Sequence, residues 1–270
     1  MDITKEKFEK HVPAFTDATE EVFAKIGGAI EHAKFEITML FGDGYEQKVL
    51  DANLAERAVC LMAAYDSVAQ LDLVLTPTGF GIVRNDHLTP ASRERTEALK
   101  DQLRKQKSDS IDILLCHLLN TEWRESAAAI SMVDQLLYCP AMFRRYGVSY
   151  ENRAVYREEM ELLAVRTTEA TAKIEKLISP ELYQDLCTKQ RDVGSMSTEE
   201  KTVLETARKT LAVYIVQAPA PYAAEQEQKL LRQLESFADQ LPAYKNSSTY
   251  AAYHLQRYEN KKEDPTFFFG

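Results

Sequence analysis

Histidine is the residue type in this chain best suited to binding a transition metal, but the spacing of the histidines does not form a ligand set. None has a glutamate three residues earlier, so the Glu-x-x-His pattern of di-iron helical bundles is absent. Cys116 and His117 are adjacent, and neighbouring helical side chains point about 100° apart, which makes a poor chelate. The sequence therefore predicts no bound metal. The histidines are His11, His32, His87, His117 and His254.

Covalent and nucleotide-dependent chemistry also lack their motifs. There is no Gly-x-Ser-x-Gly, and Cys60 lies in an apolar helical run, where a core role is expected. The paired carboxylates Glu158-Glu159 and Glu199-Glu200 are expected at helix starts or on exposed faces, where they favour the helix dipole. Gly79-Phe80-Gly81 begins like a dinucleotide-binding loop, but residue 84 is arginine in place of the third glycine. We therefore predict a protein that is not an enzyme and has no cofactor.

The composition is that of an acidic globular protein. The 270 residues are 45% hydrophobic and 28% charged, with a formal net charge of −9. Residues 1–125 carry 15 basic and 22 acidic residues, so most of the excess negative charge lies there. Affinity for phosphate comes from basic side chains, so specific nucleic-acid binding is not expected. An acidic channel would let DNA pass without binding it, whereas the alternative is ordinary charge for solubility.

Targeting signals and disulfides are not expected. Met1–Lys10 is charged and lacks the apolar core of a signal peptide. The longest apolar runs are far shorter than the ~20 residues that a membrane span requires, so we expect no membrane contact. No Cys-x-x-Cys pair occurs, which indicates free thiols in a reducing compartment. The cysteines are Cys60, Cys116, Cys139 and Cys187.

Helical periodicity dominates the chain and predicts an all-α, multi-helix bundle. Two signals are specific: Ser179 followed by Pro180 predicts a helix start, and Ser197 with Glu200 forms a capping box. Trp123, the sole tryptophan, is expected to anchor the core. Helices are expected at about residues 17–41, 46–73, 93–119, 152–178, 181–190, 198–217, 224–240 and 249–260.

The two halves of the chain have a similar order of elements. Ile30–Tyr45 resembles Thr168–Tyr183, and Ala55–Leu71 resembles Thr202–Ala218. A tandem duplication of one helical unit is one interpretation, and chance alignment of amphipathic stretches is the other. We divide the chain into a helical unit with an extended loop (1–125), a second helical unit (126–260) and an extended aromatic tail (261–270).

Two segments do not fit the helical pattern and are our candidate protein contacts. Residues 76–91 contain two prolines and two glycines around a β-prone patch, which predicts an extended, hairpin-like loop that touches another protein. Three consecutive phenylalanines near residue 268 follow a charged linker, and they either fold back on their own subunit or dock on a neighbour. The proposed contact residues are Pro77, Phe80, Ile82, Val83, Phe267, Phe268 and Phe269.

The run Leu73–Val83, followed by Pro90–Arg95, resembles an uncharacterised family encoded in phages and prophages of gut Bacteroides-type bacteria. The resemblance includes Arg57-Ala58-Val59 and the Phe-Phe-Gly ending, and members tend to lie in virion-assembly gene clusters. The order helix, helix, extended loop, helix is also similar to the head–tail connector proteins of tailed phages, although this chain is more than twice the usual connector length. Those proteins assemble as rings below the portal.

The resemblance implies a virion structural protein of the neck, made in the bacterial host cytoplasm. Its expected partners are further copies of itself in a ring, the portal and other neck proteins. DNA would pass without specific binding. Two alternatives stay open at this point: a cytoplasmic helical adaptor unrelated to virions, and an enzyme whose site is assembled from scattered residues.

Overall fold

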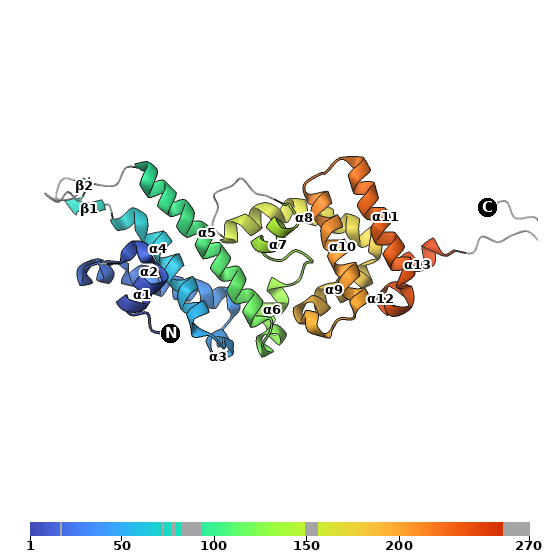
Figure 1. The fold of residues 1–270 in the computed structure, drawn as a ribbon, viewed down its shortest axis with the longest axis horizontal. Coiled ribbons are helices and arrows are strands. Elements are labelled where there is room, and N and C mark those ends of the chain that lie inside the picture. Colours follow the sequence, from blue (N-terminus) through green and yellow to red (C-terminus); the bar gives the residue numbers. More distant parts are fainter. Residues whose placement is uncertain (17, 72, 77–78, 83–92, 149–155, 256–270) are drawn as a thin grey trace, which may run out of the picture. The chain divides into compact units, whose positions relative to one another are not determined.

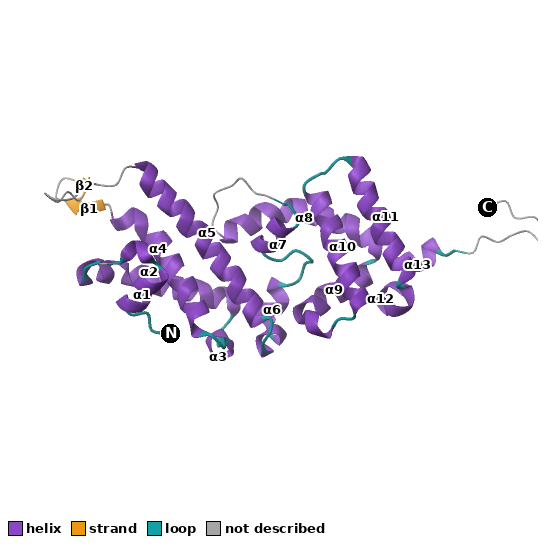
Figure 2. Ribbon diagram, viewed as in Figure 1, coloured by secondary structure: helices purple, strands orange, loops and turns teal. Residues whose placement is uncertain are grey.

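The computed structural model describes residues 1–16, 18–71, 73–76, 79–82, 93–148 and 156–255, which are helical apart from connecting loops and one β-hairpin (Figures 1 and 2). The all-α class predicted from the sequence is confirmed. Close contacts divide the chain into two units, Met1–Ala164 and Val165–Gly270. The boundary that we drew after residue 125 lies inside the first unit, and the duplication of the halves stays a prediction.

The first unit is built on three long helices. α4 (Ala52–Leu71) packs against α2 (Glu20–Phe41) and α5 (Arg93–Leu118), as Figure 1 shows. Every residue from Ala58 to Ala64 is buried, so the helix is covered on all sides there, and not on the single face that periodicity predicted. The shorter elements are α1 (Lys5–His11), η1 (Pro13–Phe15), α3 (Tyr45–Lys48), η2 (Glu122–Glu125), α6 (Ala127–Met132) and α7 (Pro140–Arg145).

The single helix predicted over residues 46–73 was wrong at both ends. Val49 is extended and separates α3 from α4. The carboxylate of Asp51 accepts a hydrogen bond from the backbone N–H of Asn53 (3.0 Å), as a helix-capping residue does, and so marks the start of α4. At the other end α4 stops at Leu71, because Leu73–Thr76 forms a strand.

Trp123 fixes the end of α2 as the sequence predicted for a core anchor. Its indole Nε1–H donates a hydrogen bond to the carbonyl oxygen of Phe41 (2.8 Å), and the two rings lie 5.6 Å apart. Gly42 then ends α2 with a φ of 79°, a conformation that glycine adopts without strain. A Cβ at Gly42 would lie 3.3 Å from the Cβ of Ala128, so the close approach of α6 also favours glycine.

A β-hairpin follows α4. Strands β1 (Leu73–Thr76) and β2 (Gly79–Ile82) are antiparallel, with Leu73 opposite Ile82 and Leu75 opposite Phe80. The predicted hairpin-like loop is therefore confirmed over its described part, although it begins three residues earlier than predicted. Residues 83–91 of that prediction lie outside the described residues.

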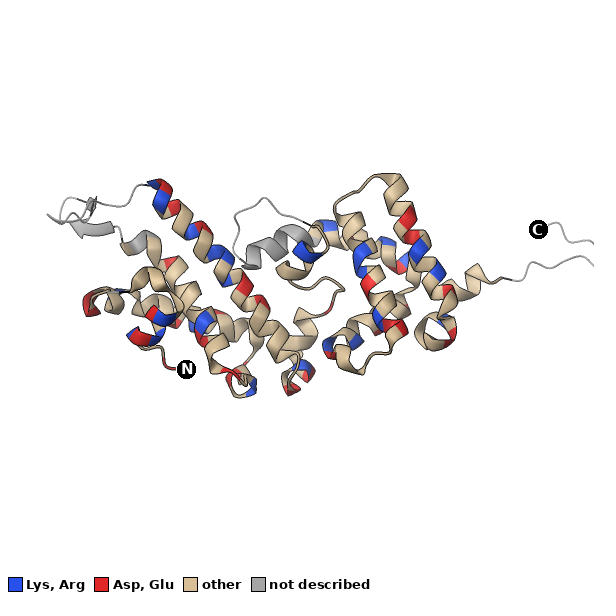
Figure 3. Cartoon of the chain, viewed as in Figure 1, with Lys and Arg blue, Asp and Glu red and all other residues tan. Residues whose placement is uncertain are grey.

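Charges of both signs alternate along α5. Figure 3 shows basic and acidic residues interleaved along this helix. The sequence of α5 begins with Arg93, Glu94 and Arg95. A continuous basic stripe, which phosphate binding favours, is absent from the described part of α5. Further along the helix, Asp112 is buried and accepts a hydrogen bond from the backbone N–H of Ala141 (2.8 Å). This bond attaches the start of α7 to the long helix.

The second unit begins at Val165, within the helix α8 (Tyr156–Ile178). The predicted helix starts at Ser179-Pro180 and at the Ser197–Glu200 capping box are confirmed. α11 begins four residues earlier than predicted, because proline is tolerated in a first helical turn. The elements are α9 (Pro180–Lys189), η3 (Gln190–Ser195), α10 (Thr198–Ile215), α11 (Ala220–Ser236), η4 (Ala238–Gln240), α12 (Pro242–Lys245) and α13 (Ser248–Tyr253).

A partly buried ion pair connects α9 with the start of α10. The ammonium of Lys189 donates to the carboxylate of Glu200 (2.5 Å), which also accepts from the backbone N–H of Ser197 (2.8 Å). Burial raises the pKa of Glu200, but these hydrogen bonds outweigh it, so the pKa lies below its usual value. A carboxyl with a lowered pKa contributes stability that is present above its unfolded-state pKa and is lost as the pH falls through the folded-state value.

We expect Glu200→Gln to reduce the free energy of unfolding by about 1–3 kcal/mol at pH 7 and by less at about pH 3, because the contribution of the ionised carboxylate is lost as the pH falls through its folded-state pKa. Glutamine keeps the capping box, so the change isolates the charge. Urea unfolding followed by circular dichroism across this pH range measures the effect. Glu199→Gln removes the same charge one position away and is the matched control. An equal loss at both pH values would contradict the assignment.

Candidate functional site

Phe80 and Ile82 lie in β2, within the stretch of chain that connects α4 with α5, two helices that pack against each other. Of the other predicted contact residues, Pro77, Val83 and the three phenylalanines from 267 to 269 lie outside the described residues. The hairpin brings Phe80 opposite Leu75 and Ile82 opposite Leu73. The described contact residues therefore belong to one short element, which begins two residues beyond the end of α4.

An apolar groove lies at the base of this hairpin, and sequence reasoning did not predict it. Its volume is about 470 Å³, and it lies between η1, the start of α2, the end of α4 and the start of α5. Phe15 and Val68 are buried, whereas the other apolar residues are partly exposed. The apolar groove is defined by Phe15, Val22, Val68, Leu71 and Leu99.

The rim of the apolar groove is polar. Thr16, Arg95 and Thr96 supply its polar groups, Ala14 and Ala18 complete the lining, and Arg95 is the only charged residue among the lining residues that the structure describes. Val22, Val68 and Leu99 lie at apolar positions of the helical pattern. Helical periodicity assigns such positions to the core, and it does not show that four elements leave part of their side chains uncovered at one place.

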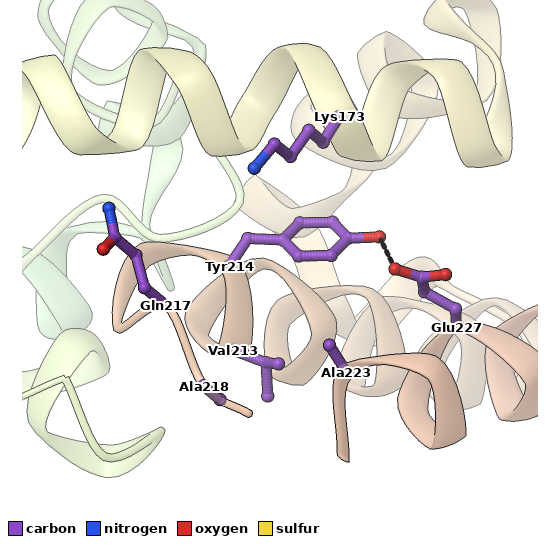
Figure 4. Close-up of a pocket in the computed structure, with 7 residues that line it drawn as sticks. All are labelled: Lys173, Val213, Tyr214, Gln217, Ala218, Ala223 and Glu227. Carbon is purple, nitrogen blue, oxygen red and sulfur yellow. Dashed lines mark hydrogen bonds between the residues drawn. The ribbon is translucent and has the colours of Figure 1, made fainter. Parts of the chain in front are cut away.

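A polar pocket of about 460 Å³ lies in the second unit, lined by residues of α8, α10 and α11 and of the turn after α10 (Figure 4). The hydroxyl of Tyr214 donates a hydrogen bond to the carboxylate of Glu227 (2.9 Å). The ammonium of Lys173 lies 5.8 Å from the centre of the Tyr214 ring. Burial, reinforced by Glu227, raises the pKa of Tyr214, so its hydroxyl stays protonated and serves as a hydrogen-bond donor.

Gln217, which lines the same pocket, has an unfavourable backbone conformation. Its φ is 52°, in the left-handed region that favours glycine. The backbone N–H of Ala218 donates a hydrogen bond to the carbonyl oxygen of Val213 (3.1 Å). This bond belongs to a helix ending in which glycine usually occupies the position of Gln217. The chain therefore carries an amide side chain beside the pocket at a position where glycine would be more stable.

A second polar groove, of about 430 Å³, lies between α2, α4 and α5. It contains charges of both signs, and its floor includes Lys107, which is buried, with its ammonium 4.9 Å from the centre of the Tyr65 ring. Burial raises the pKa of Asp66, although the nearby Lys107 partly offsets this effect. The mixture of charges suits internal ion pairing better than selective binding of a cation or an anion.

The buried thiols have the properties expected of core residues. Burial raises the pKa of Cys60 to about 12 and that of Cys139 to about 12, so neither forms a reactive thiolate near neutral pH.

His117 accepts a hydrogen bond from the backbone N–H of Leu50 (3.2 Å). Within the described residues, no group of three or more His, Cys, Asp or Glu side chains is arranged to hold a metal ion. None of the described helices is long and apolar enough to cross a membrane.

Comparison with known proteins connects part of this chain with one family. Residues 30–131 match the model of DUF6712, a family of unknown function. The match covers less than half of the chain and extends from within α2, through α4, the hairpin and α5, into α6. No curated protein and no solved structure matches the chain. The first unit is therefore similar to a family that has no assigned role, and the phage resemblance suggested by the sequence goes further than this match.

We expect Gln217→Gly to stabilise the protein by about 1 kcal/mol, because it relieves the left-handed conformation of a residue with a Cβ. Urea unfolding followed by circular dichroism measures the change. Gln228→Gly, in the regular helix α11, should instead destabilise by about 1 kcal/mol. Destabilisation by Gln217→Gly would show that the Gln217 side chain makes contacts that outweigh the strain.

Proposed function

We propose that this protein is a structural component of the neck of a tailed-phage virion, and that it assembles into a ring through protein–protein contacts. The observation that carries the proposal is the β-hairpin between α4 and α5. It is the only strand pairing in the described part of the chain, and it joins two helices that already pack against each other. Because α4 and α5 contact each other directly, their packing does not by itself call for strands in the connection, and a contact role would explain them.

The register of the hairpin supports a contact role. The pairs Leu73–Ile82 and Leu75–Phe80 alternate with Val74–Gly81 and Thr76–Gly79. Large apolar residues at every second position, paired across the strands, are the pattern of a hairpin with one apolar face. Such a hairpin is stable only when this face packs against something. A neighbouring copy in a ring, or another neck protein, would supply that partner surface.

The charge distribution supports a structural role in which DNA passes without specific binding. The chain has a net charge of −9, and the basic residues of α5 alternate with acidic ones. Neither feature favours tight binding of a phosphate backbone. The partners that the proposal requires are other copies of the chain, the portal and further neck proteins.

We expect electron microscopy of virions made by the genome that encodes this chain to place it as a ring below the portal. Phe80→Ser combined with Ile82→Ser should leave the circular-dichroism spectrum unchanged but lower incorporation into particles by about tenfold or more, because central apolar contacts dominate interface energies. Quantitative mass spectrometry of purified particles measures the incorporation.

Phe35→Ser combined with Ile130→Ser is the matched control, because it removes a phenylalanine and an isoleucine that are exposed elsewhere in the first unit. This control should be incorporated normally. Absence of the chain from purified virions would refute the neck role. Normal incorporation of the hairpin variant would refute the contact role of the hairpin alone.

A further inference from the structure

The apolar groove has the properties of a binding site for an aromatic segment. Its volume of about 470 Å³ lies within the range of pockets that enclose small apolar groups, roughly 300–1,000 Å³. Its floor includes the buried Phe15 and Val68, and its sides are the partly exposed Val22, Leu71 and Leu99. A well-packed floor with apolar sides and a polar rim is the arrangement found where interface anchors bind.

We propose that the apolar groove of one copy binds the Phe267–Phe269 segment of a second copy. This inference rests on the proposed ring assembly and names the contact that holds neighbouring copies together. Three consecutive phenylalanines are the longest aromatic run of the chain, and a charged linker precedes them. Phe15 offers an aromatic partner for edge-to-face contact, which aromatic rings prefer.

The charge next to the groove fits the segment as well. Arg95 is the only charged residue among the described residues that line the groove, whereas the phenylalanines follow Glu263 and Asp264 within a few residues. An extended chain rises about 3.3 Å per residue, so these acidic residues would lie roughly 10 Å from a phenyl ring bound in the groove. The charge of Arg95 is therefore opposite in sign to that of the two residues directly before Pro265.

A second copy is the occupant that produces a ring. The apolar groove belongs to the unit Met1–Ala164, whereas the phenylalanines follow the helices of the unit Val165–Gly270. An interface that joins two different surfaces of identical chains repeats from copy to copy, and it closes into a ring when the rotation permits. Eleven residues lie between Leu255 and Phe267, and a stretch of this length spans at most about 40 Å when extended, which allows contact with an adjacent subunit.

Photo-cross-linking of the full-length chain tests the proposal. Phe268 is replaced by the photoreactive p-benzoylphenylalanine, and equal amounts of ¹⁴N-labelled and ¹⁵N-labelled protein are mixed, irradiated and digested. We expect cross-links to peptides that contain residues 14–22, 68–71 or 95–99, with both isotopes present in one cross-linked pair. Cross-links to other regions would overturn the proposal. Cross-links that never combine the two isotopes would show binding within one chain and would overturn it as well.

Variants that fill the apolar groove provide the second readout. Thr96→Trp adds bulk at a partly exposed lining position, and Ala14→Trp does so at an exposed position of η1. Each should lower the yield of mixed-isotope cross-links by about fivefold or more, because the indole ring of the new tryptophan occupies the space that the phenylalanine segment would fill. Glu97→Trp, on the same helix but outside the groove, is the matched control and should leave the yield unchanged. An unchanged yield in both groove variants would overturn the proposal.

The analysis of purified virions and the cross-linking experiment together separate this inference from the proposed function. A chain that is found in virions but cross-links outside the apolar groove retains its neck role and loses this contact. A chain that is absent from virions but cross-links in the apolar groove between copies retains the contact and loses the neck role. The contact with a second copy can therefore fail or stand independently of where the protein acts.

Discussion

The burial of α4 is the constraint on which the rest of the first unit depends. From Ala58 to Ala64 no residue of this helix is exposed, so α2, α5 and α1 must cover it from different sides. Alanine at three of these seven positions keeps the surface of α4 low and lets its neighbours approach closely. Because α5 is part of this cover, the chain between Leu71 and Arg93 has to connect two helices that already pack together. The hairpin is thus outside the constraint that fixes the core, and its sequence is available for another purpose.

The sequence was informative where local signals decide the structure. The side chains of Ser197 and Glu200 accept hydrogen bonds from the free backbone N–H groups at the start of α10. At the start of α9, Ser179 does the same, and Pro180 has no N–H to satisfy. Both helix starts could therefore be predicted from neighbouring residues alone. The prolines and glycines after Thr76 likewise predicted a hairpin. Asp51 shows the opposite case: it caps α4 through Asn53, but an aspartate inside an otherwise helical pattern gave too weak a signal to divide the helix.

The parts that sequence reasoning missed depend on contacts between distant residues. The short helices between Leu118 and Tyr156 have little periodicity, and their positions follow from Trp123 bound to the Phe41 carbonyl and from Asp112 bound to Ala141. Partners 82 and 29 residues apart are not visible in a local pattern. The apolar groove is of the same kind, since it exists only where η1, α2, α4 and α5 meet. Each of its apolar residues looks like an ordinary core position when it is considered by itself.

The two proposed contacts would differ in the order in which they form. Strand β1 begins two residues after the end of α4, so the position of the hairpin is tied to that helix. The phenylalanine segment follows a charged, proline-containing stretch of eleven residues after Leu255. When one of two linked contacts forms first, it raises the effective concentration of the second surface, to the order of millimolar for short linkers. We expect binding of the segment to the apolar groove to precede the hairpin contact, and the hairpin, as an extension of α4, would then set the angle between neighbouring copies. In such an assembly the segment contributes mainly to affinity, whereas the hairpin determines whether the ring closes and with how many subunits.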